Sequence, residues 1–264
     1  MLITMTYCLA IKVDEGLVFA SDSRTNAGVD HVSTYSKMHT FAWPSDRFFV
    51  LLSAGNLATT QAVVKRLKAD AQDSWAFSLR TAQDMDAAAN YVGKVSTDIQ
   101  RNQSERDTSS ASFEATFIFG GQIAGGEPVI FLIYPQGNYI HESSDHPFLQ
   151  EGETKYGKPI LDRVIRHDTP LELAGRCALV SINSTIRSNL AVGPPVELLL
   201  YPAYGHGNYR RLLLKENDPF YRSMNEAWNE GLRQALNNLP PFEWEQEVRA
   251  VQLVQEAAFT RTMG

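Results

Sequence analysis

The sequence predicts an α+β fold: a four-layer αββα sandwich, in which two antiparallel sheets lie face to face and helices flank them. The first observation behind this prediction is the order of the segments, which runs strands, two helices, strands, two helices, strands and a closing helix. Alternating runs of strands and runs of helices favour this class. The second is that the links between consecutive strands are of hairpin length. This favours antiparallel pairing, because parallel strands need a long crossover connection.

The first half of the chain supplies strands and then two helices. The segments TYCLAIKV and GLVFASDSRT, on either side of an acidic turn before Gly16, have the β-branched and aromatic composition of a hairpin. The segment RFFVLLS is a nearly continuous apolar run, typical of a buried strand that Gly55 then ends. Further predicted elements are a strand over 33–40 and helices over 57–71 and 81–103.

The second half repeats the pattern. Strands are predicted in FEATFIFGG, PVIFLIYP and NYIHES, and later in VELLLY and YRRLLLK. Between these groups, helices are predicted over 156–167 and 170–187, with Asp168 and Thr169 placed to cap the second one. A last helix is expected to begin near Asp218 and Pro219, and it carries apolar residues at intervals of four until two prolines interrupt it.

Composition limits the class of protein. The chain has 264 residues and a formal net charge of −6, which argues against nucleic-acid binding because phosphate contacts need a positive surface. No apolar stretch approaches the ~20 residues of a membrane span, so no membrane partner is expected. The two cysteines, Cys8 and Cys177, lack the spacing of a zinc site or a disulfide framework, so we expect a cytoplasmic protein without a metal or other cofactor. We predict a single domain over 1–264, with 240–264 as a C-terminal helical extension.

Three residues near the N-terminus combine the groups of a hydrolytic site. Thr6 is preceded by Met5, Asp22 lies in ASDSRTN and Lys37 lies in YSKMH. Asp22 follows Thr6 by 16 residues, and Lys37 follows Asp22 by 15. Taken singly, a threonine in a strand, an aspartate at a turn and a lone lysine are ordinary structural residues. Their combination at this spacing points to a site.

The segments around these residues resemble the β-type subunits of the proteasome, which are N-terminal-nucleophile hydrolases. The similarity covers nearly the whole order of elements, and its matching stretches are MTYCLAIKVDEGLVFASDSRTNAG, SKMH, LLSAGNLATTQ and INSTIRSNLAVGPP. The resemblance implies that Thr6 is the nucleophile, Asp22 its carboxylate partner and Lys37 the catalytic ammonium. It also implies a peptide or amide substrate and a homo-oligomer of many subunits, arranged as a ring or an open spiral.

The same resemblance assigns two further residues. Gly55, in Ser-Ala-Gly-Asn, matches the family glycine whose backbone N–H helps to form the oxyanion hole. Arg24 matches the arginine of the family's Asp-x-Arg motif, and we expect it to organise the loop of Asp22 rather than to react.

The chain also departs from the family pattern. The interval between Asp22 and Lys37 is one residue shorter than in the proteasome subunits, and no Asp-x-x-Ser-Gly precedes VELLLY. Ser188 and Asn189 are the nearest substitutes for that motif. Thr154, in EGETKYG, takes the place of a serine that precedes a helix.

Elementary chemistry supports the same three residues. A threonine hydroxyl is a weak nucleophile at neutral pH and needs a base beside it. A free α-amine, with a reference pKa of about 8, can serve as that base directly or through one water. A lysine ammonium near both groups favours the neutral amine and the developing alkoxide, and an aspartate keeps that lysine charged. This chemistry requires Thr6 at the chain terminus, which translation from Met5 and removal of that methionine would produce.

The leading functional hypothesis is therefore a threonine-dependent amide hydrolase, expected to be a peptidase, in a self-compartmentalising homo-oligomer. A catalytically silent structural or binding ring with the same fold is the alternative, and hydrolysis of a small-molecule amide is a third possibility, because one fold supports many functions. Cys8 would share the face of Thr6 in its strand, and we expect it to be a buried apolar residue rather than a nucleophile.

The segment 240–264 is too apolar for a free solvated tail. Its large apolar residues are Phe242, Trp244, Val248, Val251, Leu253, Val254 and Phe259. One interpretation is that the segment packs onto its own subunit. We favour contact between neighbouring subunits, because the predicted sandwich already has helices on both outer faces and leaves a lateral edge uncovered.

Overall fold

The computed structural model describes residues 6–26, 32–73, 77–107, 111–203 and 208–245. Two five-stranded sheets dominate it, and every strand pair is antiparallel. The first sheet has the order β10 (Phe148–Gly152), β1 (Tyr7–Val13), β2 (Gly16–Ser21), β11 (Val196–Pro202) and β12 (Arg210–Leu214). The second has the order β5 (Met38–Trp43), β6 (Arg47–Gly55), β7 (Ala115–Ile123), β8 (Val129–Ile133) and β9 (Tyr139–His141).

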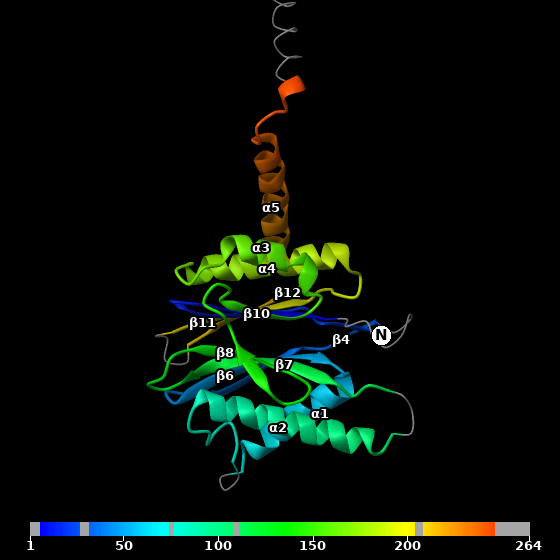
Figure 1. Cartoon of the computed structure of the whole chain (residues 1–264), viewed down its shortest axis with the longest axis vertical. Helices are drawn as coiled ribbons and strands as arrows, with labels where there is room; N and C mark the ends of the chain where they lie inside the picture. The colour runs from blue at the N-terminus through cyan, green and yellow to red at the C-terminus, as the bar shows by residue number, and fades with distance from the viewer. Residues whose placement is uncertain (1–5, 27–31, 74–76, 108–110, 204–207, 246–264) are drawn as a thin grey trace, which may run out of the picture. The chain divides into compact units, whose positions relative to one another are not determined.

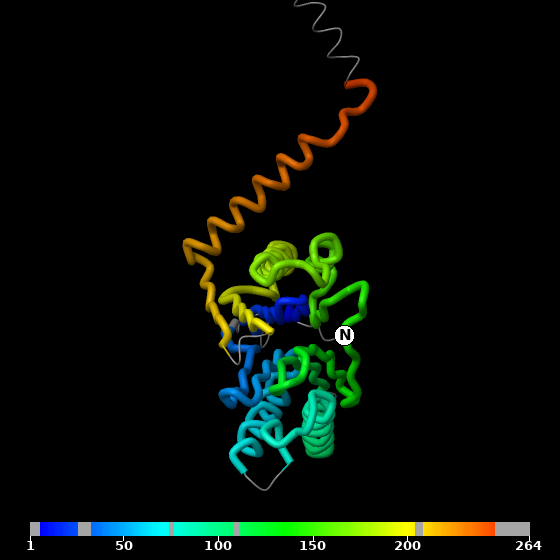
Figure 2. The backbone as a smooth tube through the Cα atoms, turned by 90° about the vertical axis from the view of Figure 1, so that its left-hand side faces the viewer, coloured from blue at the N-terminus to red at the C-terminus, as the bar shows by residue number. Residues whose placement is uncertain are grey.

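Helices form the two outer layers (Figure 1). On the second sheet lie α1 (Leu57–Asp70) and α2 (Met85–Ser104), and on the first lie α3 (Lys158–Val164) and α4 (Leu171–Ser188). Figure 2 shows the same layers from the side, with the two helix pairs on opposite sides of the sheets. Two short elements complete this part of the chain: a ribbon of β3 (Arg24–Asn26) with β4 (Val32–Thr34), and the 3₁₀ turn η1 (Thr154–Tyr156). The predicted αββα sandwich is confirmed.

The chain divides into two compact units, Met1–Tyr221 and Arg222–Gly264. The sandwich lies in the first unit. The second unit begins within α5 (Pro219–Asn237), the predicted closing helix, and is described as far as Glu245. The domain boundary predicted at residue 240 remains a prediction, and most of 240–264 lies outside the described residues.

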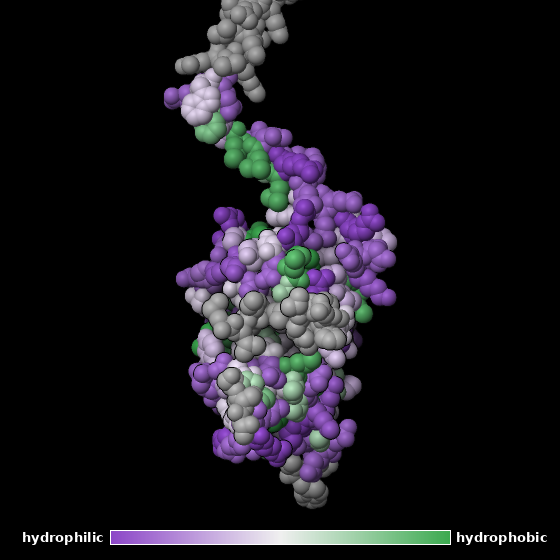
Figure 3. Space-filling view, turned by 90° about the vertical axis from the view of Figure 1, so that its right-hand side faces the viewer, coloured by the Kyte–Doolittle hydropathy of each residue, from purple (hydrophilic) through white to green (hydrophobic). Residues whose placement is uncertain are grey.

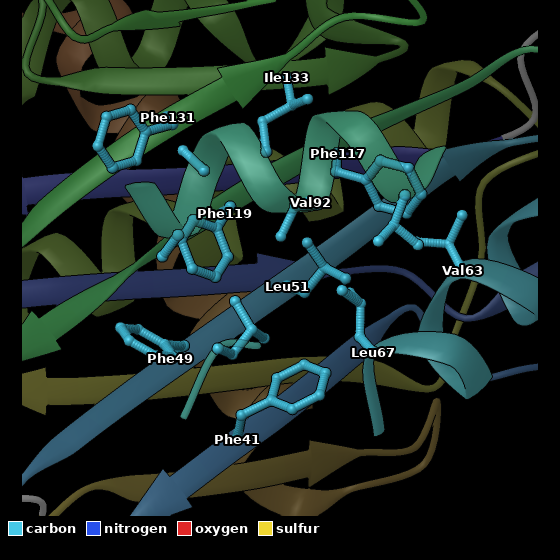
Figure 4. Packing of buried hydrophobic residues seen from close by; sticks show 14 of the residues in the cluster. Phe41, Phe49, Leu51, Val63, Leu67, Val92, Phe117, Phe119, Phe131 and Ile133 are labelled. Carbon is cyan, nitrogen blue, oxygen red and sulfur yellow. The ribbon is translucent and has the colours of Figure 1, made fainter. Parts of the chain in front are cut away.

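Strand β6 explains why the sandwich holds together. Its side chains alternate between two cores: Phe48 and Val50 face the first sheet, whereas Phe49 and Leu51 face α1 and α2. Figure 4 shows the second of these cores, where side chains from β6, β7 and β8 meet Val63 and Leu67 of α1 and Val92 of α2. A strand buried on both faces has no polar alternation, which is why RFFVLLS reads as a continuous apolar run.

Two local predictions were wrong, and one strand was not predicted. The strand expected over 33–40 is divided into β4, which pairs with β3, and β5, which pairs with β6, because the chain passes from the short ribbon to the second sheet between them. The helix expected from residue 81 begins at Met85, where the side chain of Asp84 accepts a hydrogen bond from the N–H of Ala87 at 2.7 Å. Strand β10 was not predicted at all.

The predicted cap of α4 was also wrong. Pro170 is the N-cap residue and provides no side-chain hydrogen bond. A carboxylate far along the sequence takes that role, since Glu15 Oε2 accepts a hydrogen bond from the N–H of Leu171 at 2.7 Å. The hydroxyl of Thr169 instead accepts from the N–H of Arg166 at 2.9 Å.

Two features are absent from the described part of the chain. None of its helices combines the length and the apolar character needed to cross a membrane. Nor do its histidine, cysteine and carboxylate side chains come together in any group of three suited to a metal ion.

Candidate active site

The candidate site is built around the buried carboxylate of Asp22, directly after β2. Its Oδ1 accepts hydrogen bonds from the backbone N–H of Tyr7, at 3.1 Å, and from Nζ of Lys37, at 2.5 Å. Its Oδ2 accepts from the backbone N–H groups of Arg24, at 3.2 Å, and Gly193, at 3.1 Å. A carboxylate is an acceptor-only group, and these four donors satisfy it in the absence of water.

Lys37 reaches this carboxylate from the side of the second sheet. It lies directly before β5, and its C=O accepts a hydrogen bond from the N–H of Ser53 in β6 at 3.0 Å. Its Nζ also donates to the C=O of Arg24 at 2.8 Å. Lys37 is 6% exposed and Asp22 is 0% exposed, so the pair is buried. Because burying an ion pair costs desolvation energy and is a weak source of stability, a chemical role explains it better than a folding role.

Thr6 directly precedes β1, and contacts of Thr6 and Tyr7 anchor this part of the backbone. The C=O of Thr6 accepts a hydrogen bond from the N–H of Glu153 at 2.9 Å. The side chain of Tyr7 is fully buried, and its hydroxyl is hydrogen-bonded to Ser181 Oγ at 2.8 Å and to Gln150. The first residue of the strand is therefore anchored to both β10 and α4.

The ion pair of Asp22 and Lys37 lies one hydrogen bond from the peptide that follows Thr6. The Lys37 ammonium and the N–H of Tyr7 donate to the same Asp22 oxygen, so the ammonium is two hydrogen bonds from the peptide that follows Thr6. Thr6 is 7% exposed in this chain. The structure thus brings together the backbone of Thr6, the carboxylate of Asp22 and the ammonium of Lys37.

Burial and the ion pair act on Asp22 in opposite directions. Burial away from water raises the pKa of Asp22, whereas the Lys37 ammonium and the N–H groups of Tyr7 and Gly193 oppose that rise. The four donors offset only part of the effect of burial, so the pKa of Asp22 stays above the ordinary value of an aspartate.

Arg24 joins the Asp22 turn to the loop after α4. Its Nη1 donates to the C=O of Leu190 at 2.6 Å, and the N–H groups of Ser23 and Arg24 donate to the C=O of Gly193 at 3.2 and 3.3 Å. A Cβ on Gly193 would lie only 2.3 Å from atoms of the guanidinium group. These are the contacts expected of an arginine that organises the Asp22 loop.

The other predicted residues lie near this centre without contacting the carboxylate. Ser188 is exposed at the end of α4, and Asn189 caps that helix, with its Oδ1 accepting from the N–H of Ala191 at 2.9 Å. Both belong to the loop that Arg24 contacts. Thr154 opens η1, directly after the residue that is hydrogen-bonded to the C=O of Thr6.

Gly55 lies at the exposed end of β6, two residues beyond the contact between Ser53 and Lys37. Its φ is +99°, and a Cβ there would lie 2.5 Å from the C=O of Glu114, so only glycine fits.

Cys8 is 1% exposed, and burial raises the pKa of its thiol. The prediction that Cys8 is a buried apolar residue is confirmed, because a protonated, buried thiol is inert.

The chain is similar to known proteins in both sequence and structure. Residues 4–199 match the proteasome subunit family. The chain belongs to that family. The resemblance seen in the N-terminal motifs is therefore confirmed, together with the fold that it implies.

Solved structures of Anbu, the ancestral β-subunit of this family, are similar to nearly the whole chain. Anbu from Yersinia bercovieri is 43% identical, with a TM-score of 0.82, over 90% of this chain and 99% of that one. Anbu from Pseudomonas aeruginosa, solved as a helical assembly, is 44% identical, with a TM-score of 0.85, over 89% and 98% of the two chains. Anbu from Hyphomicrobium sp. strain MC1 is 44% identical, with a TM-score of 0.79, over 90% and 99%. No curated protein sequence matches.

Sequence reasoning missed the glycines and backbone donors of the site. Gly193, in AVGPP, supplies an N–H to Asp22, and Gly152 approaches Thr6 so closely that a Cβ would lie 2.0 Å from its C=O. Every residue has a backbone N–H, so no pattern marks the one from Tyr7. A glycine next to two prolines was a usable signal for a tight loop, whereas Gly152 gave none because β10 was not predicted.

We predict that Gly152→Ala destabilises the site end of the sandwich more than Gly125→Ala does. The two glycines have similar backbone conformations, with φ of +88° and +83°, but nothing lies within 4 Å of a Cβ at Gly125. Both variants therefore carry the same dihedral strain, and only Gly152→Ala must also displace the C=O of Thr6. Denaturant unfolding should show an additional loss of about 2 kcal/mol for Gly152→Ala. Equal losses would show that the close approach to Thr6 is unimportant.

Proposed function

We propose that the chain is a threonine-dependent hydrolase of peptide or amide bonds that works in a cytoplasmic, self-compartmentalising homo-oligomer. The observation that supports the proposal is the shared Asp22 oxygen, which accepts hydrogen bonds both from the Lys37 ammonium and from the N–H of Tyr7, the residue after Thr6. Membership of the proteasome subunit family supports the reaction class. The two cysteines, both free and buried, support a reducing compartment.

In the proposed reaction, Thr6 Oγ attacks the carbonyl carbon of the amide, and its proton passes to the α-amine of the same residue. The tetrahedral intermediate then collapses: the C–N bond breaks, the leaving amine takes that proton, and an ester on Thr6 remains. Water, activated by the α-amine, hydrolyses the ester and restores the hydroxyl. The chemistry needs no group outside the chain except water.

The charges of the site suit each step. The Lys37 ammonium opposes a second positive charge on the α-amine, which keeps that amine a base, and it stabilises the alkoxide as the proton leaves. Asp22 holds the ammonium in place. The N–H of Gly55 is the proposed donor to the oxyanion, and one such donor is commonly worth about 3 kcal/mol of transition-state stabilisation.

The proposal requires a free amine on Thr6, so the active form lacks residues 1–5. Those residues lie outside the described part of the chain. Met5 precedes a residue with a small side chain, so removal of an initiating methionine at this position would expose Thr6 without self-cleavage.

We predict that Thr6→Ala lowers kcat for hydrolysis of a peptide amide by about 10³-fold or more, because no other described group takes the place of the nucleophile. Thr6→Ser is the matched control: it keeps the hydroxyl and the amine, and it should retain measurable activity.

Lys37→Met should lower kcat by a factor similar to that of Thr6→Ala, and the double variant should be no worse than either single variant. Thermal melting will show that each variant is folded. Unchanged cleavage by Thr6→Ala would refute the chemistry, and lasting absence of cleavage in the parent would favour the silent ring.

The exposed residues of the C-terminal unit support an assembly role. Leu232, Leu236, Leu239, Phe242 and Trp244 are each 45% to 67% exposed, and the last two rings stack at 4.5 Å. Figure 3 shows apolar surface along this unit. Apolar surface of this extent on a single chain marks an interaction site. The relative from Pseudomonas aeruginosa was solved as a helical assembly, which fits a second copy of this chain as the partner.

Truncation before Pro240 tests this role. The sandwich lies within a compact unit that ends at Tyr221, so the shortened chain should fold. We expect light scattering to show monomers or small oligomers where the full chain forms a large particle, because the removed segment carries interface area. A folded particle of unchanged mass would mean that 240–264 is dispensable for assembly.

A further inference from the structure

A second ion pair, between a buried carboxylate and a partly exposed guanidinium group, lies beside the segment that carries Lys37. Glu197, in β11, is 3% exposed, and its Oε1 accepts a hydrogen bond from Nη2 of Arg211, in β12, at 2.5 Å. Its Oε2 accepts from the hydroxyl of Ser36 at 2.8 Å. One carboxylate therefore joins the first sheet to the residue that precedes Lys37.

The same groups also hold the residue that follows Lys37. Arg211 Nη2 donates to the C=O of Met38 at 3.2 Å. The Ser36 hydroxyl, whose single proton goes to the nearer Glu197 oxygen, lies 3.0 Å from the same C=O. Both neighbours of Lys37 are thus fixed by one polar cluster, which consists of Glu197, Arg211 and Ser36. We call this cluster the Glu197 clamp.

The Glu197 clamp lies next to the first ion pair in the sheet. Glu197 is paired with Ser21 in the register of β11 and β2, and Ser21 directly precedes Asp22. The segment that carries Lys37 is therefore held at two points: Asp22 binds the ammonium, and the Glu197 clamp binds the Ser36 hydroxyl and the C=O of Met38. Two fixed points leave a long lysine side chain little freedom, which matters because a small displacement from productive geometry costs much of the rate.

Holding the β11–β12 hairpin together is a poor explanation for this cluster. Five residue pairs, from Val196 with Leu214 to Leu200 with Arg210, already form that ladder. An ion pair whose arginine side chain is 34% exposed adds little to stability, so apolar residues at these positions would serve the hairpin as well. What apolar residues cannot do is accept from Ser36 and donate to Met38.

We propose that Glu197 and Arg211 are positioning residues. They hold the segment Ser36–Met38 so that the Lys37 ammonium stays hydrogen-bonded to Asp22, close to the backbone of Thr6. The purpose of this arrangement rests on the proposed threonine chemistry. The positioning itself does not, and it can be measured without any turnover.

The test is lysine acetylation of the full-length, assembled protein with an N-hydroxysuccinimide ester, followed by peptide mass spectrometry. In the parent, Lys37 is buried and should react slowly. Glu197→Gln keeps the shape but loses the charge, and Arg211→Met loses the fork of donors. We expect each variant to acetylate Lys37 about tenfold faster, because the segment opens locally more often. Arg211→Lys keeps the charge and should restore slow acetylation in part.

Two controls separate local from global effects. Glu142→Gln removes a carboxylate that pairs with Lys12 at 2.8 Å, away from the Glu197 clamp, and it should leave Lys37 acetylation unchanged. Lys12, in β1 of the same sandwich, has a side chain that is 24% exposed, so its acetylation rate reports general lysine reactivity and should stay constant in Glu197→Gln and Arg211→Met. Thermal melting of each variant reports global stability.

Hydrolysis provides the second measurement. In the clamp variants, kcat should fall about tenfold with KM unchanged, because the substrate-binding surface is intact. If Lys37 stays as protected as in the parent while the melting temperature falls, the cluster only stabilises the hairpin and the proposal is wrong. If no hydrolysis depends on Thr6, the proposed function fails, but the acetylation rates still decide whether the clamp holds Lys37.

Discussion

The rest of the site depends on one interaction, the enclosure of the Asp22 carboxylate by four hydrogen-bond donors. An unpaired charge at this depth would cost several kcal/mol, so the chain must bring donors to it. Three of the four are backbone N–H groups, from Tyr7, Arg24 and Gly193. Because backbone donors fix the path of the chain, satisfying this carboxylate also sets the start of β1, the turn after β2 and the loop before β11.

The fourth donor connects the two sheets. Asp22 follows a strand of the first sheet, and Lys37 precedes a strand of the second, where its C=O continues the pairing with Ser53. The site thus lies where the ends of both sheets meet, and the two cores on either side of β6 keep that junction rigid. The backbone around Thr6 is held from two further directions, by the buried Tyr7 side chain and by the close approach of Gly152.

The parts of the fold that the sequence predicts well are those with a local signal. RFFVLLS was identified as a buried strand because every position after Arg47 is apolar or small, and the hairpin around Gly16 because composition and turn agree. Strand β10 was missed because FLQEG is short and half polar. Its Gln150 is hydrogen-bonded to Tyr7, a partner 143 residues away that no local window contains. The cap of α4 failed for the same reason, since Glu15 and Leu171 meet only in three dimensions.

The candidate site divides in the same way, into residues with a local sequence signal and contacts between residues that are distant in sequence. Thr6, Asp22 and Lys37 were recognisable as residue types at a family-like spacing, whereas the backbone donors and the Glu197 clamp depend on the register between strands. The break in the strand predicted over 33–40 is informative here. A continuous strand would satisfy local propensity, but its first part pairs with β3 and its second part with β6, and these partners lie in different sheets.

The central claim is that Thr6 reacts through its hydroxyl with its own free amine as the base. The most direct measurement is intact-mass and peptide mass spectrometry of the purified active protein, before and after treatment with a peptide epoxyketone. The two electrophilic carbons of that reagent are captured together by a hydroxyl and an amine on one residue. The account predicts a chain that begins at Thr6 and a single adduct located on that residue. A hydrolytically active protein that retains Met1, or that is modified elsewhere, would contradict it.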